Sequence, residues 1–490
     1  MRKLFALAGI VILVLAVVVG AKTLLGHSRQ LVVAPATAAV VDAPAAAARL
    51  AGAVRFKTIA SVDDPDANAA EFTGLQAHLQ ASFPKAHALL QRELIGKYGL
   101  LYTWPGTDPK AAPFALMAHQ DVVPIAPGTT ADWQEPPFAG VVKGDFIWGR
   151  GAWDDKGNLM SIMEAVELLA ASGFKPRQTI YLVFGQDEEI GGERGALQVA
   201  QQFKQRGIRL QFVLDEGLLI TEGVLKGLDK PAALVGVAEK GHLTVQLTAS
   251  ATPGHSSMPP PQPEESAIGM LSAGLARLEN QQMPLAIRGQ AEEMFATLAP
   301  EMTGINRIFL SNLWLFRPLI ESQLKKAAST SASLRTTTAL TVVNAGNAFN
   351  VLPGRADAVV NFRLMPGDSS DAVVQHVVRT LSNPNIKVVK GTFAEASRVA
   401  AIDAPGYQLI NRTLRQLHPD VVVAPGLMLA ATDSRHFEAV ADNIYKFSPV
   451  RAKPEDLKRF HGTNERISSA NYVELIQFYH QLIVNTAPAP

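Results

Sequence analysis

The 490-residue sequence contains no cysteine, which excludes disulfide-bonded scaffolds, thiolate nucleophiles and cysteine-ligated zinc. Any metal ion must therefore be held by histidine, aspartate or glutamate side chains. Because both reducing and oxidising compartments contain cysteine-free proteins, this absence does not indicate where the protein works.

The sequence also lacks an excess of charge of either sign. Lys and Arg number 45 against 44 Asp and Glu, so the net charge is +1. This balance argues against a nucleic-acid partner held by a basic surface. Apolar types make up 48% and charged types 18%, which excludes intrinsic disorder. At about 150 residues per domain, the length predicts two to four domains.

One long apolar segment is present, at the N-terminus. Arg2 and Lys3 precede an uncharged run from Leu4 to Ala21, which as a helix is about 27 Å long and close to the hydrocarbon thickness of a bilayer. The run predicts a single-span membrane anchor, with a cleaved signal sequence as the alternative. Basic residues before it place the N-terminus inside and the body outside, in a periplasmic or lumenal location.

Strand-like and helix-like segments alternate after an Ala/Pro-rich stretch, residues 32–48, that is typical of a tether. Residues 113–118, 179–185 and 211–214 are apolar runs typical of buried parallel strands. Residues 159–169 between the first two have helical apolar spacing, and Gly173 ends that helix. This rhythm predicts an α/β sheet.

The pattern changes near Gly241. Residues 242–250 alternate polar and apolar types, as in a strand with one solvated face. The following elements are predicted as a helix at 264–278, strands at 336–343 and 356–364, a helix at 370–381 and a strand at 386–389. That β-α-β-β-α-β order is the split ferredoxin-like plan, and residues 299–333 form an additional helical excursion.

Acidic and histidine residues follow several of the predicted strands. The segments are MAHQDVVP (117–124), GRGAWDDKG (149–157), GQDEEIGG (185–192) and LDEG (214–217). Taken singly, each has an ordinary explanation as a surface turn, a helix N-cap or a solvated acidic loop. Taken together, they follow strands whose carboxyl ends meet at one edge of an α/β sheet, where sites form. The pattern therefore predicts a carboxylate/histidine metal site.

These four segments and the late HGTNERI (461–467) resemble the peptidase M20 family of dinuclear zinc hydrolases, in particular its carboxypeptidase S and N-acyl-amino-acid hydrolase branch. The resemblance extends from about residue 50 to 485. It implies a zinc-dependent exopeptidase-like α/β catalytic domain with an inserted ferredoxin-like lid, in addition to the N-terminal helix. The expected division is residues 1–30 for the anchor or signal, 31–240 and 393–490 for the catalytic domain, and 241–392 for the lid.

The resemblance implies five metal ligands, which are His119, Asp154, Glu189, Asp215 and His461. His119 and Asp215 would hold one zinc ion, and Glu189 and His461 the other. Asp154 would bridge the two ions, through a segment whose Asp154–Asp155 peptide is cis in relatives. Oxygen and imidazole ligands also suit Mn or Co.

The remaining roles are implied for residues beside the metals and in the lid. Glu188 would be the general base, and Asp121 would orient His119. His255, Asn350 and Arg363 match lid positions that contact substrate, His255 across the dimer interface in dimeric members. The segment 432–436 (TDSRH) also resembles a family segment near the substrate, without an assigned role.

The expected activity is hydrolysis of an amide bond next to a free carboxylate by a membrane-anchored enzyme. A carboxypeptidase of short peptides is the leading interpretation. The first alternative is an amidohydrolase of N-acyl amino acids, a reaction that some relatives run in reverse. An alternative of another class is a noncatalytic anchored binding protein. A homodimer through the lid is a further expectation.

Overall fold

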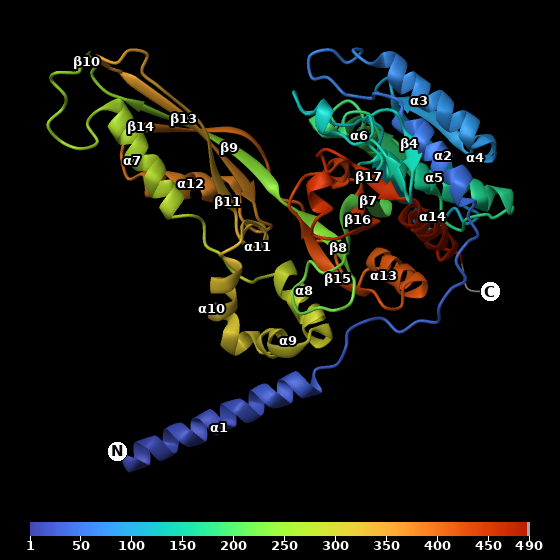
Figure 1. Ribbon diagram of the computed structural model, residues 1–490, viewed down its shortest axis with the longest axis horizontal. Helices are drawn as coiled ribbons and strands as arrows, with labels where there is room; N and C mark the ends of the chain where they lie inside the picture. The colour runs from blue at the N-terminus through green and yellow to red at the C-terminus, as the bar shows by residue number, and fades with distance from the viewer. Residues whose placement is uncertain (488–490) are drawn as a thin grey trace.

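An eight-stranded mixed sheet forms the centre of the larger part of the molecule in the computed structural model, which describes residues 1–487 (Figure 1). Its strand order is β1-β2-β6-β3-β7-β16-β8-β15. The strands are β1 (Gln91–Ile95), β2 (Gly99–Trp104), β3 (Phe114–His119), β6 (Ile180–Gly185), β7 (Leu210–Thr221), β8 (Ala232–Glu239), β15 (Val422–Met428) and β16 (Ala441–Ala452). The three apolar runs of the sequence correspond to β3, β6 and β7, which pair in parallel at the middle of the sheet.

Helices cover both faces of this sheet. On one face α5 (Lys156–Ala171) packs against α14 (Ser469–Val484), α2 (Ala43–Val54) and α4 (Pro84–Leu89), with α13 (Pro405–Leu417) beside them. On the other face α6 (Ala196–Gln205) covers a second apolar cluster. Gly173 follows α5 with φ +74°, a conformation that favours glycine. The predicted α/β architecture is confirmed.

A separate four-stranded antiparallel sheet, which we call the lid sheet, has the order β11-β13-β9-β14. Its strands are β9 (Gly241–Ser250), β11 (Thr337–Ala345), β13 (Arg355–Leu364) and β14 (Ile386–Ala394). Helices α7 (Ala267–Asn280) and α12 (Ser370–Leu381) pack on it and bury a core of its own. The chain order β9-α7-β11-β13-α12-β14 is the predicted ferredoxin-like plan. In Figure 1 this unit extends away from the large sheet.

The predicted excursion is helical, and it contacts both the large sheet and the N-terminal helix. It contains α9 (Gly304–Ser311), α10 (Leu313–Leu324) and α11 (Ala328–Ala332), and the helical segment begins before the predicted bound, with α8 (Gln290–Leu298). Leu298 and Met302 bury their side chains against Val422 and Ala424 of β15, so the excursion is fixed to the edge of the large sheet. Helix α9 also contacts α1 (Arg2–Leu25).

The segment expected to be a tether is a docked chain followed by a buried helix. Ala43 begins α2, because the Asp42 side chain accepts a hydrogen bond from Ala45 N and alanine favours helix. Leu50 of α2 is fully buried, which stabilises the fold by about 1.5–3 kcal/mol. Before the helix, the Gln30 side-chain amide donates to Val423 O (3.0 Å) and accepts from Val423 N (2.7 Å) on β15.

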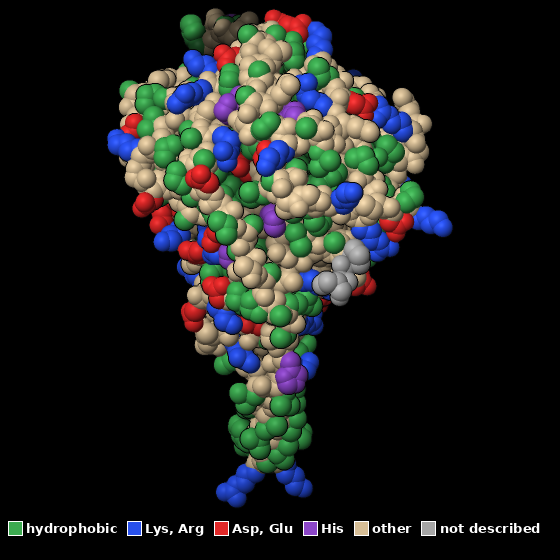
Figure 2. All heavy atoms as spheres, turned by 90° about the vertical axis from the view of Figure 1, so that its right-hand side faces the viewer, with side chains coloured by type: hydrophobic (Ala, Val, Ile, Leu, Met, Phe, Trp, Pro, Cys, Tyr) green, Lys and Arg blue, Asp and Glu red, His purple; other side chains and the backbone are tan. Residues whose placement is uncertain are grey.

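Helix α1 is a 24-residue apolar helix with only Thr23 buried. Its length and composition are sufficient to cross a membrane, and a signal sequence passes the same test. Figure 2 shows α1 as an apolar stalk that leaves the body and ends in basic side chains.

Candidate metal centre

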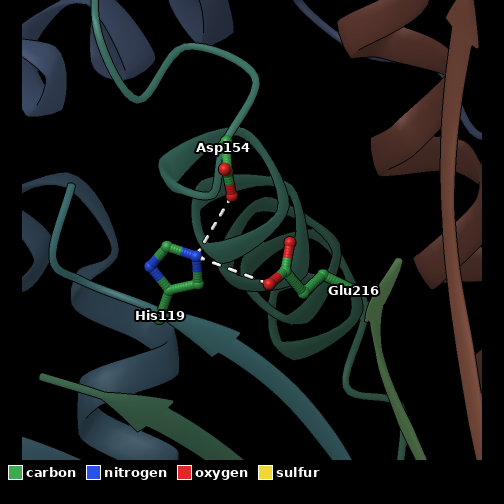
Figure 3. Close-up of side chains that lie close together, drawn as sticks. All are labelled: His119, Asp154 and Glu216. Carbon is green, nitrogen blue, oxygen red and sulfur yellow. Dashed lines mark hydrogen bonds and ion pairs between the residues drawn. The ribbon is translucent and has the colours of Figure 1, made fainter. Parts of the chain in front are cut away.

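Three side chains from three elements meet at the carboxyl edge of the large sheet. His119 ends β3, Asp154 lies in the turn before α5, and Glu216 lies in β7. His119 Nε2 is 3.1 Å from Asp154 Oδ1 and 3.6 Å from Glu216 Oε1, and the three side chains point toward one another (Figure 3). All three are buried, so their ligand atoms face a shared interior space.

A second group shares Asp154 with the first. His461 Nε2 is 2.7 Å from Asp154 Oδ2 and 3.2 Å from Glu189 Oε1. Glu189 Oε1 is buried, and His461 Nε2 is its polar neighbour. Asp154 therefore directs one carboxylate oxygen to each histidine. Its peptide bond to Asp155 is cis, as the resemblance implied.

Asp215 differs from expectation, because the structure brings it into neither group. Its Oδ2 accepts from Ser434 N (2.9 Å) and its Oδ1 from Glu216 N (3.0 Å). Neighbouring residues of a strand point to opposite sides, so only one of the pair can face His119. Glu216 takes the place that we expected for Asp215.

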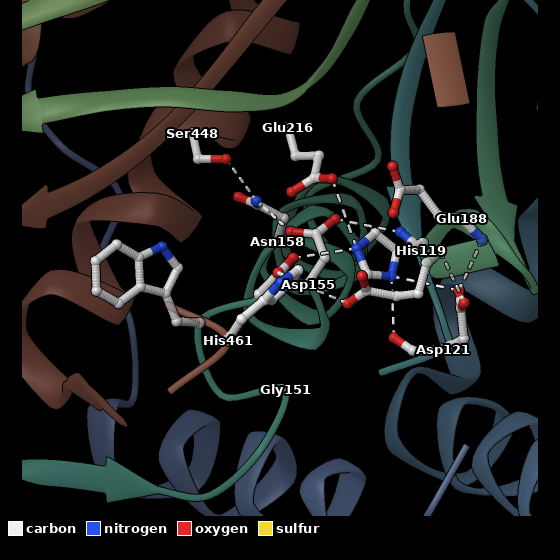
Figure 4. A network of polar contacts seen from close by, with 12 residues as sticks. His119, Asp121, Gly151, Asp155, Asn158, Glu188, Glu216, Ser448 and His461 are labelled. Atoms are coloured by element: carbon white, nitrogen blue, oxygen red, sulfur yellow. Dashed lines mark hydrogen bonds and ion pairs between the residues drawn. The ribbon is translucent and has the colours of Figure 1, made fainter. Parts of the chain in front are cut away.

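Asp121 connects the histidine to the acidic loop after β6. His119 Nδ1 donates to the backbone carbonyl of Asp121 at 2.9 Å, and an Asp121 carboxylate oxygen lies 3.4 Å from the same nitrogen. The two carboxylate oxygens accept from the backbone N–H groups of Glu188 and Glu189, both at 3.1 Å. Asp121 thus fixes the imidazole and both glutamates, and Glu188 lies beside His119 (Figure 4).

Glu465 is a residue of the site that sequence reasoning missed. Its fully buried Oε1 accepts from the backbone N–H groups of Gly151 (2.9 Å), Trp153 (3.0 Å) and Asp154 (3.1 Å). Its Oε2 pairs with Arg150 at 2.5 Å, and Arg150 donates to the backbone carbonyl of His461 at 3.1 Å. Glu465 therefore joins the loops that present Asp154 and His461. Its place within HGTNERI was the only signal in the sequence.

The electrostatics of the cluster show unbalanced negative charge. Burial raises the pKa of Glu188 and of Glu216 well above their ordinary values, and neighbouring carboxylates act in the same direction. Hydrogen bonds to Asp154 and Glu189 raise the pKa of His461 to about 10. Burial lowers the pKa of His119, but Asp121 and Asp154 outweigh it and hold the pKa well above its usual value.

The donor set fits a pair of divalent cations. Each group offers one imidazole nitrogen and two carboxylate oxygens within 4.8 Å of one another, and Asp154 belongs to both. Imidazole binds metal in its neutral form, so bound cations would replace the protons that the carboxylates now stabilise on the two histidines. The position of Glu189 Oε1, buried and 3.2 Å from His461 Nε2, agrees with a ligand role.

The three predicted lid residues are not joined to this cluster by any hydrogen bond or ion pair in the described chain. His255 lies in the short strand β10 (Gly254–His255), which pairs with β12 (Val351–Leu352), at the end of the lid farthest from the large sheet (Figure 1). Asn350 lies beside it, since its carbonyl accepts from Ser256 N at 3.0 Å. Both side chains are exposed.

Arg363 lies at the opposite end of the lid sheet, opposite His242 at the start of β9. Burial lowers the pKa of His242, and the positive charges of Arg435 and Arg363 add to this effect, so both guanidinium groups lie near it. Arg435 belongs to the TDSRH segment and binds Glu239, the last residue of β8, at 3.1 Å. Arg363 of the lid and Arg435 of the turn at 433–437 thus lie near one region at the β8–β9 junction (Glu239–Gly241).

Comparison with known proteins agrees with this geometry. Residues 115–485 match the family model described as peptidase family M20/M25/M40. The chain is 41% identical over 445 residues to probable carboxypeptidase S-like 2 of Dictyostelium discoideum, covering 90% of this chain and 85% of that protein. It is 42% identical over 439 residues to an N-fatty-acyl-amino acid synthase/hydrolase (PM20D1.1) of Danio rerio, covering 89% and 84%.

Among solved structures, an M20 family metallo-carboxypeptidase from Sulfolobus solfataricus shares the fold, with a TM-score of 0.62 at 16% identity over 91% of this chain and 99% of that chain. The family is metal-dependent, and its members support an enzyme rather than a noncatalytic binding protein. On the match of most of its length and on these identities, the chain belongs to peptidase family M20.

Proposed function

We propose that this M20 hydrolase is a two-metal carboxypeptidase of short peptides, with zinc as the resident metal. Glu216 and His119 would hold one ion, and Glu189 and His461 the other. Asp154 would bridge them. The observation that carries the proposal is the sharing of Asp154 between two groups of ligand atoms, with Glu188 beside them. Mn or Co could occupy the same oxygen and imidazole ligands.

Two bound ions would polarise the scissile carbonyl and make a nearby water a stronger acid. Glu188 is the residue that would accept the proton from this water and pass it to the leaving amine. Its backbone N–H is held by Asp121, so the base and His119 keep a fixed relative position. No serine or cysteine nucleophile is needed.

Selection of a free carboxylate requires a cation outside the metal groups. Arg363 fits this role because guanidinium binds carboxylate through two parallel hydrogen bonds. Its side chain is exposed at the β8–β9 junction near Arg435, so closing of the lid would bring it over a bound substrate.

A second candidate function is hydrolysis, or the reverse synthesis, of N-acyl amino acids. It is favoured by the 42% identity to the Danio rerio N-fatty-acyl-amino acid synthase/hydrolase. The bond that is cleaved and the adjacent carboxylate are the same in both substrate classes, so the same groups would act. The acyl side of the pocket would differ.

We expect the purified enzyme to hydrolyse dipeptides with a free C-terminal carboxylate, and to lose this activity when a chelator removes about two divalent ions per chain. Metal analysis and a parallel assay of dipeptides and N-acyl amino acids check this. Faster turnover of N-acyl amino acids would favour the second candidate. Activity unaffected by chelation, with no bound metal before treatment, would contradict both.

We expect Arg363→Ala to lower kcat/KM on substrates with a free carboxylate. The corresponding activation free energy should rise by about 3 kcal/mol, as for loss of one partner of a desolvated charge pair. Amide-capped substrates should be poor for the wild type and little changed by the substitution. Arg355→Ala is the matched control, because Arg355 lies on the same strand and is exposed at its other end. Equal losses on free and capped substrates would remove Arg363 from recognition and leave Arg435 as the cation to test.

The lid sheet and its helices are proposed to form a domain of residues 241–392, inserted between the two parts of the catalytic domain. His255 lies at the far tip of this lid, so a role for it in catalysis would require a second copy of the chain. This agrees with a homodimer through the lid, in which Asn350 would also contact the partner's substrate.

We also propose that α1 is retained as a membrane anchor, with the catalytic body outside the cytoplasm. We expect a chain lacking residues 1–26 to be soluble and fully active, because α1 buries only Thr23 and no residue of the metal groups lies there. Fractionation of both forms and an activity assay check this. Recovery of a shortened mature chain from cells producing the full sequence would instead show a cleaved signal.

A further inference from the structure

An exposed apolar surface covers the outer side of α9 and α10. We call it the α9–α10 patch, and its residues are Ile305, Ile308, Trp314, Leu315 and Leu319. Ile305 is 62% exposed, Trp314 49% and Leu319 45%, although the lid and the large sheet have well-filled cores. Clustered apolar exposure of this kind marks an interaction surface.

The patch is the outer face of two helices whose inner faces are already used. Phe309, Phe316 and Ile320 point inward and form a cluster with the chain before α8. Leu315 and Leu319 are four residues apart on α10, so they share one side of the helix, next to the side that Phe316 and Ile320 bury. The fold of the excursion thus leaves these side chains partly exposed, with only the end of α1 beside them in the described chain.

The neighbour of the patch is the end of α1. Asn312, between α9 and α10, donates to Thr23 Oγ1 at 3.0 Å and to the backbone carbonyl of Val19 at 3.3 Å. Arg307 donates to the backbone carbonyl of Thr23 at 3.3 Å, and the Lys22 ammonium lies 5.5 Å from the centre of the Trp314 ring. In Figure 1, α9 lies above the C-terminal half of this helix.

We propose that the α9–α10 patch enters the interfacial layer of the phospholipid bilayer that α1 crosses, an inference that rests on the membrane anchoring proposed above. Residues 4–21 of α1 would lie in the hydrocarbon, so its last turn, and the patch bound to it, reach the headgroup level. Trp, Lys and Arg together are typical of this layer, and Trp314, Lys22 and Arg307 supply all three types.

Two attachments to one membrane fix the orientation of the catalytic body. Helix α1 alone would permit rotation about its axis, whereas the patch, joined through Leu298 to β15, would hold the large sheet at one angle to the surface. The proposed partner of the α9–α10 patch is therefore the lipid surface itself, rather than a second protein.

Trp314 supplies the test, because the other four tryptophans, Trp104, Trp133, Trp148 and Trp153, are 8% exposed or less. The full chain is reconstituted into phosphatidylcholine vesicles with and without lipids brominated near the headgroup end of the acyl chain. We expect the brominated lipids to remove most of the Trp314 emission. Trp314→Phe should abolish the quenching, since its remaining tryptophans are buried.

Resistance to alkaline extraction, measured on the same vesicles, reports insertion of α1 separately. Resistant protein without quenching of Trp314 would overturn the patch proposal alone, and would include the case in which a second copy covers the patch. Extracted protein would overturn the anchor and the patch together. Leu315→Glu with Leu319→Glu should reduce quenching while leaving the protein resistant to extraction.

Discussion

Glu188→Gln is expected to keep both metal ions and to lose about 100- to 10,000-fold in kcat, the contribution of a positioned general base. The amide is nearly isosteric with the carboxylate but cannot accept a proton. Because the contact between Asp121 and residue 188 uses the backbone N–H, the loop should keep its position. Metal content by elemental analysis and kcat on a cleaved dipeptide measure the two effects separately.

Glu189→Gln is the matched control, one residue away in the same loop and held by the same Asp121 carboxylate. Its Oε1 lies 3.2 Å from His461 Nε2, so this substitution should lower metal content. Metal loss from both variants, or from neither, would contradict the division of roles between the two glutamates.

Glu216→Gln and Asp215→Asn are expected to separate a ligand from its neighbour. Glu216→Gln removes a charged oxygen that faces His119, so metal content should fall from about two ions to about one, with loss of activity. Asp215→Asn should keep both ions, because its oxygens accept from the backbone at Ser434 and Glu216. We expect Asp215→Asn to shift the TDSRH segment and to weaken substrate binding.

The measurement is metal stoichiometry of both variants after gel filtration in metal-free buffer, together with KM and kcat. Retention of two ions by Glu216→Gln with loss of one by Asp215→Asn would restore the ligand set that the resemblance implied. Equal metal loss in both would indicate that the local strand, rather than one side chain, holds the ion.

Elements with a strong local pattern could be predicted from the sequence. The apolar runs form β3 and β6, and the alternating residues 242–250 form β9. In each of them the spacing of apolar residues predicts which side chains are buried. Helix α2 was missed because its Ala/Pro-rich start resembles a linker, and its helicity depends on the Asp42 cap and on burial of Leu50. Such packing is decided by distant parts of the chain.

The same distinction applies to the site. His119 and Glu189 follow strands whose ends meet at one edge of the sheet, which the sequence pattern indicated, whereas the full set with Asp154 and His461 was implied only by the family resemblance. The choice between Asp215 and Glu216 depends on which face of β7 meets His119. Side chains of a strand alternate between its two faces, but the sequence alone does not tell which face lies toward His119. Glu465 acts through three backbone N–H groups, a contact that leaves no trace in residue spacing.

The contact of Gln30 with Val423 has a consequence for aggregation. Strand β15 is the last strand of the large sheet, and an unpaired edge offers its N–H and C=O groups as a template for a strand of another molecule. The Gln30 amide imitates a peptide group and satisfies both groups of Val423. A chain shortened beyond residue 30 would open this edge to strand addition, whereas one that starts at residue 27 would keep it closed.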